Sequence, residues 1–242
     1  MNLRTKISVI FALIFFLGLI NSRAMATTTI DNFTEDALNG SLSGPGSISN
    51  TVGGFDPNNV VGGFRFSSLQ FQSGTGTITA SVSGGILSVT SSQTANGAIE
   101  LTYTGSNSGI PNLNLNVSGD NQLRIAFTVF NFAGSQSMPV TVSLFNSPVN
   151  NSQVVQFLST GGPQNLIFPF SVFGPLDFSS INGIDMLFDA AVGQSFSVDF
   201  IQTEVGGRIP EPSTLVLLMA GIAGLFGWNH RRIRVLHRNR DR

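Results

Sequence analysis

Residues 123–129 have the sequence LRIAFTV, the clearest strand pattern in the chain. Its apolar residues at 123, 125, 127 and 129 alternate with polar or small ones, so every second side chain points to the same side. That period of two is typical of a β-strand with one buried face. The same alternation recurs in residues 140–144 (VTVSL) and 196–200 (FSVDF). These three stretches predict strands that face a common core.

On both sides of these stretches, short apolar runs separated by Gly, Asn, Ser and Pro predict further strands, and no long amphipathic helical pattern competes with them. Many short strands at this spacing predict an all-β fold, an antiparallel β-sandwich or jelly roll, over a body at residues 27–208. Residues 35–62 are the least regular part and are expected to form a long loop. The further strands are expected at 64–71, 76–82, 85–90, 98–103, 112–117, 153–158, 164–170 and 183–188.

Composition excludes several functional classes. The chain has no cysteine, which excludes thiol catalysis, disulfides and thiolate metal sites. Both histidines, His230 and His237, follow the body, so a Ser-His-Asp triad cannot be built within it. The body carries three Arg against eleven Asp and Glu, and this acidic balance argues against a nucleic-acid partner.

The first 26 residues match a signal peptide. Arg4 and Lys6 precede an apolar run at residues 7–20, which is short for a membrane span. Ala24-Met25-Ala26 is an A-x-A cleavage signal. We therefore expect export and a mature chain that starts at Thr27, with a retained N-terminal anchor as the alternative.

The other end has three parts in order. Pro210-Glu211-Pro212 is followed by an apolar stretch at 213–228 and then by Arg231, Arg232 and Arg234, with a basic tail at 235–242. As a helix, residues 213–228 extend about 24 Å against a hydrocarbon layer of about 30 Å, which predicts a short transmembrane helix. The arginines are expected to stop transfer and remain cytoplasmic.

The tripeptide, the Gly-rich apolar stretch and the Arg cluster together resemble the PEP-CTERM sorting signal over residues 209–234. The resemblance implies an exosortase as partner, a membrane-embedded transpeptidase of Gram-negative bacteria that make exopolysaccharide. It implies a transient stay in the inner membrane and then a place on the outer surface or in the extracellular matrix. An ordinary C-terminal anchor is the alternative.

The ends of the body resemble the galactose-binding-like jelly roll, on Ile30-Asp31-Asn32-Phe33 near the start and Ser197-Val198-Asp199-Phe200 near the end. In that fold the first and last strands often meet, and acidic residues there hold a structural calcium. The resemblance thus implies a calcium ion at Asp31 and Asp199. The alternative is that Asp31 caps a turn and Asp199 faces water.

Two functional classes remain open. Sugar-binding faces generally use Trp and Tyr, and the body has no Trp and one Tyr, although hydrogen bonding from Asn, Gln and Asp stays available. Asp177, Asp185 and Asp189 are the candidates for a glycosidase carboxyl pair, but Asp beside Gly and Ser more often serves a turn. We expect a non-catalytic surface or matrix protein among exopolysaccharide. The alternative is a carbohydrate-binding or glycan-degrading secreted protein.

Overall fold

In the computed structural model, the described residues are 27–35, 38–106, 112–131, 137–147, 150–159 and 163–206. The chain divides into two compact units, Met1–Val205 and Gly206–Arg242. The predicted signal peptide, the Pro210-Glu211-Pro212 motif, the 213–228 span and the Arg cluster lie outside the described residues. Within the described part of the chain, no helix is long and apolar enough to cross a membrane.

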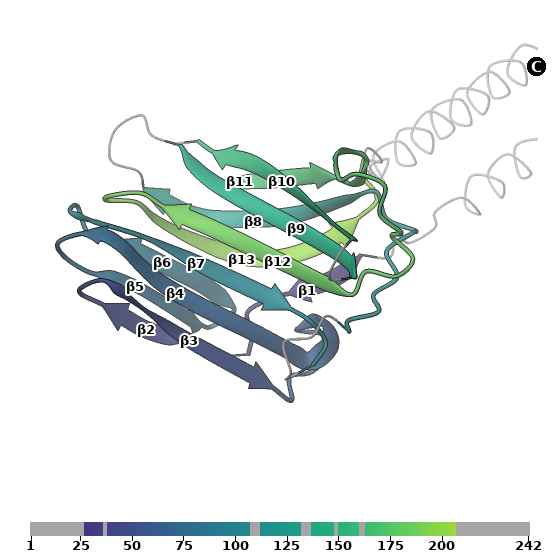
Figure 1. Cartoon of the computed structure of the whole chain (residues 1–242), viewed down its shortest axis with the longest axis horizontal. Coiled ribbons are helices and arrows are strands. Elements are labelled where there is room, and N and C mark those ends of the chain that lie inside the picture. The colour runs from purple at the N-terminus through teal and green to yellow at the C-terminus, as the bar shows by residue number, and fades with distance from the viewer. Residues whose placement is uncertain are drawn as a thin grey trace, which may run out of the picture. The chain divides into compact units, whose positions relative to one another are not determined.

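The described body is all β apart from two short 3-10 turns, which confirms the predicted antiparallel sandwich (Figure 1). The elements are β1 (Thr28–Asp31), β2 (Asn39–Leu42), β3 (Gly46–Gly53), η1 (Val61–Gly63), β4 (Phe64–Gly74), β5 (Ile78–Ser83), β6 (Ile86–Ser91), β7 (Ala95–Tyr103), β8 (Gln122–Asn131), β9 (Met138–Ser147), β10 (Asn150–Leu158), β11 (Gln164–Pro169), η2 (Phe170–Val172), β12 (Gly183–Ala190) and β13 (Ser195–Glu204).

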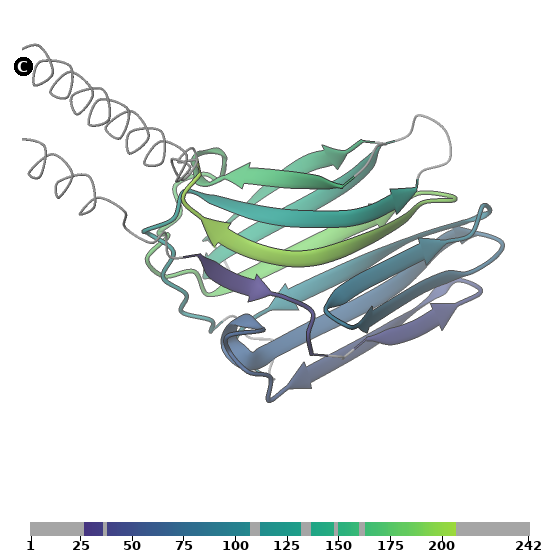
Figure 2. The ribbon, with the colours of Figure 1, turned by 180° about the vertical axis from the view of Figure 1, so that it is seen from behind.

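The strands form two sheets. The six-stranded sheet has the order β10-β9-β12-β7-β4-β3. The seven-stranded sheet has the order β11-β8-β13-β6-β5-β2, and β1 pairs with β13 beside this path. The view from behind shows β1 lying along β13 (Figure 2). The first and last strands of the body therefore meet, as the resemblance implied.

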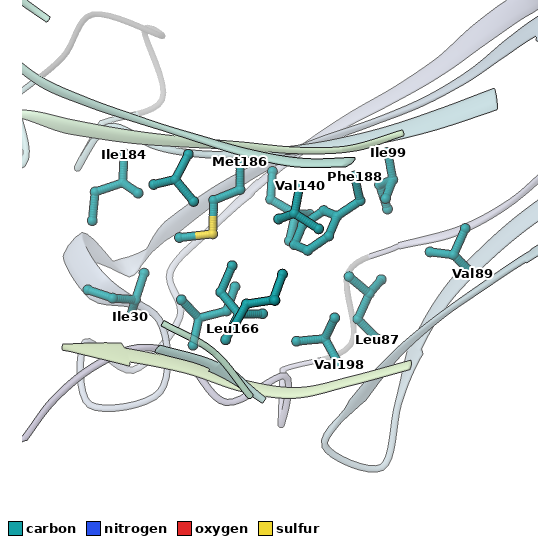
Figure 3. Packing of buried hydrophobic residues seen from close by; sticks show 14 of the residues in the cluster. Ile30, Leu87, Val89, Ile99, Val140, Leu166, Ile184, Met186, Phe188 and Val198 are labelled. Atoms are coloured by element: carbon teal, nitrogen blue, oxygen red, sulfur yellow. The ribbon is translucent and has the colours of Figure 1, made fainter. Parts of the chain in front are cut away.

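The core lies between the two sheets. Ile99, Met186 and Phe188 project from the six-stranded sheet towards Leu87 and Val198 of the seven-stranded sheet (Figure 3). All five side chains are fully buried. The central strands contribute alternate residues to this layer, because successive side chains of a strand point to opposite faces. The alternation at Leu123, Ile125 and Phe127 and in residues 140–144 thus marks core-facing strands. In residues 196–200 it holds only for Phe196 and Val198, because a bulge after Val198 places Ile201 in the core and leaves Phe200 half-buried beside Arg124.

Two sequence predictions are wrong. Residues 35–62 were expected to be a loop but include β2 and β3. These strands lie at the outer ends of the two sheets and are mostly exposed, so they lack the apolar alternation by which a strand is recognised. Residues 112–117 were expected to be a strand. They form no strand, and their ladder pairing is limited to an isolated bridge between Leu115 and Ile181.

Candidate functional site

The N-terminal strand ends in a buried polar network. Nη1 of Arg65, on β4, donates to Oδ2 of Asp31 at 2.6 Å, and both side chains are 0% exposed. The Tyr103 hydroxyl donates to the same oxygen at 2.8 Å, and the Phe33 N–H donates to Oδ1 at 2.8 Å. Both oxygens of Asp31 therefore have partners inside the protein. The bond from Phe33 is the turn cap that was the alternative interpretation of Asp31.

The guanidinium of Arg65 is enclosed on several sides. Nη2 donates to the Glu35 carbonyl at 2.7 Å, while the rings of Phe33 and Phe55 lie 5.5 and 5.3 Å from its central carbon. Both ring distances are within the range of cation–π attraction. Nε has no hydrogen-bond partner among the described residues. The buried charge of Arg65 thus connects β4 to β1, to the loop that follows β1 and to the loop that follows β3.

Burial governs the ionisation of this network. It raises the pKa of Asp31, and the Arg65 guanidinium counteracts part of that rise. Burial also holds the pKa of Tyr103 well above its usual value, and the neighbouring charge of the Asp31 carboxylate adds to that rise. The hydroxyl of Tyr103 is therefore a fixed hydrogen-bond donor and not an acid.

A calcium ion fits this arrangement poorly. Calcium takes six to eight oxygen ligands, whereas the oxygens of Asp31 already face a guanidinium, a hydroxyl and an N–H. Asp199 lies on β13 two residues before Ile201, the register partner of Asp31, and is half-buried. Among the described residues, no three His, Cys, Asp or Glu side chains gather as a metal site would require. The assignment of calcium to Asp31 and Asp199 stays a prediction, and these contacts do not favour it.

A second polar area lies on the outer face of the six-stranded sheet, which we define by Phe66, Glu100, Thr102, Ser143 and Asp185. Strand register aligns Phe66, Thr102, Asp185 and Ser143 in one row across β4, β7, β12 and β9. Their sequence neighbours on these strands include core residues, so the row faces away from the core. The side chains on this face are mainly half-buried.

Two carboxyl groups on this outer face interact. Asp185 accepts a hydrogen bond from the Thr102 hydroxyl at 2.9 Å. Burial raises the pKa of Asp185. It also raises the pKa of Glu100, and the neighbouring charge of Asp185 adds to that rise. The two side chains therefore compete for a proton on a surface that is partly closed to water.

The sequence singled out Asp185, but it gave no reason to pair it with Glu100. Asp189 lies on the same strand and the same face. Asp177 lies apart from them, in the loop before β12, where the N–H and hydroxyl of Ser179 bond to Oδ1 at 2.9 and 2.6 Å. These bonds hold the pKa of Asp177 below its usual value. Asp177 is therefore a turn residue, as its Ser-rich surroundings indicated.

Several solved structures are similar to this chain at low identity and with TM-scores below 0.5. A family 11 carbohydrate-binding module from Clostridium thermocellum, in complex with a beta-1,3-1,4-mixed-linked tetrasaccharide, is 16% identical, with a TM-score of 0.40 over 76% of this chain and 98% of that chain. A family 29 carbohydrate-binding module is 14% identical, with a TM-score of 0.37 over 76% and 91%. An agarase is 10% identical, with a TM-score of 0.37 over 58% of this chain and 23% of its own.

The sequence comparisons address the tail. No curated protein sequence matches this chain. Residues 208–232 match the family model of the PEP-CTERM protein-sorting motif, which confirms the resemblance seen in Pro210-Glu211-Pro212 and the residues after it. That motif implies export and membrane-associated sorting in Gram-negative bacteria. The chain thus carries a PEP-CTERM protein-sorting motif at residues 208–232.

Proposed function

We propose that this protein is a non-catalytic component of the cell surface or of an exopolysaccharide matrix, and that exosortase processes it at Pro210-Glu211-Pro212. The observation that carries the proposal is the sorting motif at residues 208–232, which immediately follows a folded sandwich. The body is acidic and free of cysteine, so it suits an exported domain that folds on its core alone. This function requires two partners, an exosortase and, transiently, the inner membrane.

The arrangement of the carboxyl groups supports a non-catalytic body. Glu100 and Asp185 are neighbours on one sheet face, and Asp185 is already bonded to Thr102. A glycosidase instead places its two carboxyl groups on either side of a scissile bond. Glu100 and Asp185 lie on adjacent strands of one sheet face, a position better suited to binding than to cleavage.

Processing is tested in cells that possess an exosortase. Full-length protein is blotted with one antibody to the body and one to the tail. We expect the wild-type body to lose the tail epitope, and Glu211→Ala to accumulate a full-length precursor in the inner membrane. Asp241→Ala, which removes another acidic residue of the tail, is the matched control and should be processed normally. Body and tail on one polypeptide in wild-type cells would show an ordinary anchor.

A second candidate function is glycan binding by the outer face of the six-stranded sheet. The row through Phe66, Thr102, Asp185 and Ser143 offers an aromatic ring, hydroxyls and a carboxylate, the groups that bind sugar rings and their hydroxyls. Glu100, Asp185 and Asp189 lie on this face, and none of its described outward positions carries Lys or Arg. Such a face would favour neutral over acidic polysaccharide.

Affinity electrophoresis in gels with embedded polysaccharide tests this candidate. The protein should be retarded by a neutral glucan or galactan and not by alginate. Phe66→Ala and Thr102→Val should abolish the retardation. Thr90→Val, on β6 of the other sheet, is the matched control and should leave it unchanged. Equal migration with and without every polysaccharide would leave the surface or matrix role without glycan binding.

A further inference from the structure

The last strand of the body lies in the middle of its sheet. β13 pairs with β8 along its whole length, from Ser195 opposite Asn131 to Glu204 opposite Gln122. Its other edge is shared by two strands that follow each other along it. β6 pairs with residues 195–198, and β1 pairs with residues 201–203. β13 therefore contacts three strands that come from distant parts of the chain.

Without β13 the seven-stranded sheet falls into separate pieces. β11 and β8 form one piece, β6, β5 and β2 form another, and β1 has no other strand partner among the described residues. All strands of the six-stranded sheet precede β13 in sequence, since β12 is the last of them. The apolar inner face of that sheet nevertheless needs the other sheet to cover it. The sandwich therefore lacks a closed core until β13 is in place.

The side chains of β13 also show that the core depends on this strand. Phe196, Val198 and Ile201 are at most 1% exposed. The ring of Phe196 stacks on Phe188 of the six-stranded sheet at 5.5 Å, and Phe127 of β8 meets both rings edge-on at 6.1 Å. This aromatic cluster joins three strands of both sheets, and it is completed by a residue of β13.

We propose that β13 is a closing strand, which keeps the body from folding until the chain has been exported almost to its sorting motif. The inference rests on the proposed function, since it takes the chain to cross the membrane from its N-terminal end. Glu204 ends β13, and the sorting motif begins at residue 208. The residues that complete the core thus arrive just ahead of the residues that are sorted.

This order has a use in export. A chain that cannot close its core stays extended enough to be translocated, because non-local strand pairing is slow and needs both partners present. It also couples two events, since the body becomes compact only when the sorting motif reaches the membrane. An exosortase would then meet a folded body attached to its motif.

The absence of native cysteine makes the order measurable. Two pairs of serines with matched geometry lie on paired strands. The hydroxyl oxygens of Ser88 and Ser197 lie 3.2 Å apart across β6 and β13, and those of Ser49 and Ser68 lie 3.3 Å apart across β3 and β4. In the full chain, an S88C/S197C disulfide reports the docking of β13, while an S49C/S68C disulfide reports a local hairpin of the other sheet. Pulse-chase samples are scored for disulfide, signal-peptide removal and protease resistance of the body.

We expect protease resistance to appear together with the S88C/S197C disulfide and not with the S49C/S68C disulfide. A body that is resistant before the S88C/S197C disulfide forms would overturn the proposal. If the signal peptide stays attached and neither disulfide forms, the proposed export is wrong. Refolding of the purified full chain, read out with the same two pairs, then decides the folding order separately.

A point variant gives a second readout. Val198→Asp places a charge on β13 at a side chain that is fully buried, and Val155→Asp places the same charge on the edge strand β10, where the valine is 48% exposed. In the full chain, Val198→Asp should remove protection from amide exchange throughout both sheets, and Val155→Asp should leave it intact. Protection that persists in the six-stranded sheet of Val198→Asp would show that this sheet folds without β13.

Discussion

Arg65 and Asp31 form an ion pair that is closed to water, with Nη1 and Oδ2 2.6 Å apart and both side chains fully buried. The two residues are 34 positions apart in the chain. The pair joins β1 to β4 and so connects the two sheets at one end of the sandwich. Since the hydroxyl of Tyr103, on β7, bonds to the same oxygen, three strands depend on one carboxylate.

Removing either residue of the Arg65–Asp31 pair should lower the free energy of unfolding substantially. Arg65→Met leaves Asp31 buried without its counter-charge, and breaking such a pair typically costs about 3–5 kcal/mol of unfolding free energy. The control is Arg124→Met, because Arg124 and Glu204 form a partly exposed pair at 3.4 Å, and such pairs contribute about 0–1 kcal/mol. Urea unfolding followed by circular dichroism measures both. Equal losses for the two variants would contradict the assigned role of Arg65.

Calcium should leave the melting temperature unchanged. The oxygens of Asp31 are bonded to Arg65, Tyr103 and Phe33, so an added ion would have to displace a guanidinium. Melting curves of the wild type and of Asp199→Ala, each with calcium and with chelator, test this. A rise with calcium that Asp199→Ala abolishes would instead establish the calcium site predicted from the sequence, since a ligand that binds only the folded state raises its stability.

Much of the fold could be predicted from the sequence, because the core strands alternate apolar and polar residues. Leu123, Ile125 and Phe127 face the core as that pattern requires. β3 could not be found in this way, since it is an edge strand with little apolar burial. Arg65 was missed for another reason. It occupies a core-facing position in series with Leu69 and Phe71, and a buried charge in such a series is recognisable only once its partner is known.

The outer face of the six-stranded sheet should make stability depend on pH. Since the pKa values of Glu100 and Asp185 are raised in the folded protein, folding favours their protonated forms. Their contribution is therefore fully present below about pH 4, the usual carboxyl range, and is lost as the pH rises through the folded pKa values. Asp185→Asn should reduce this loss, which thermal melts between acidic and neutral pH would show.

Asp177 supplies a control of opposite sign. Its pKa is lowered by the bonds from Ser179, so its contribution is present at neutral pH and is lost on acidification. Asp177→Asn should therefore remove a contribution that makes the folded state more stable at neutral pH than in acid. Asp185→Asn should remove a contribution that makes it more stable in acid. Identical pH profiles for the two variants would contradict the environments described for these carboxyl groups.

Close packing of β7 against β4 predicts the effect of a single methyl group. A Cβ on Gly97 would clash with the carbonyl oxygen of Gln70 and would lie 2.5 Å from Cδ1 of Ile78. The carbonyl belongs to the sheet and cannot move freely, so Gly97→Ala should destabilise the body by about 1–3 kcal/mol, as overpacking usually does. Gly44→Ala, where no atom lies within 4 Å, is the control. The midpoint of urea unfolding should fall for Gly97→Ala and stay unchanged for Gly44→Ala. Equal midpoints for the two variants would contradict the prediction.

The position of β13 also determines how the body would bear force. In a protein held at its C-terminal end, a pulling force on the body would first act on Glu204, the last residue of β13, and then along that strand. That strand is bonded to β8 on one edge and to β6 and β1 on the other, so many hydrogen bonds share the load at once. Among the described residues, β1 pairs with β13 alone and over a short length, so a pull from the N-terminal end would load fewer hydrogen bonds. Attachment through the sorting motif would therefore load the strand that pairs with β8, β6 and β1.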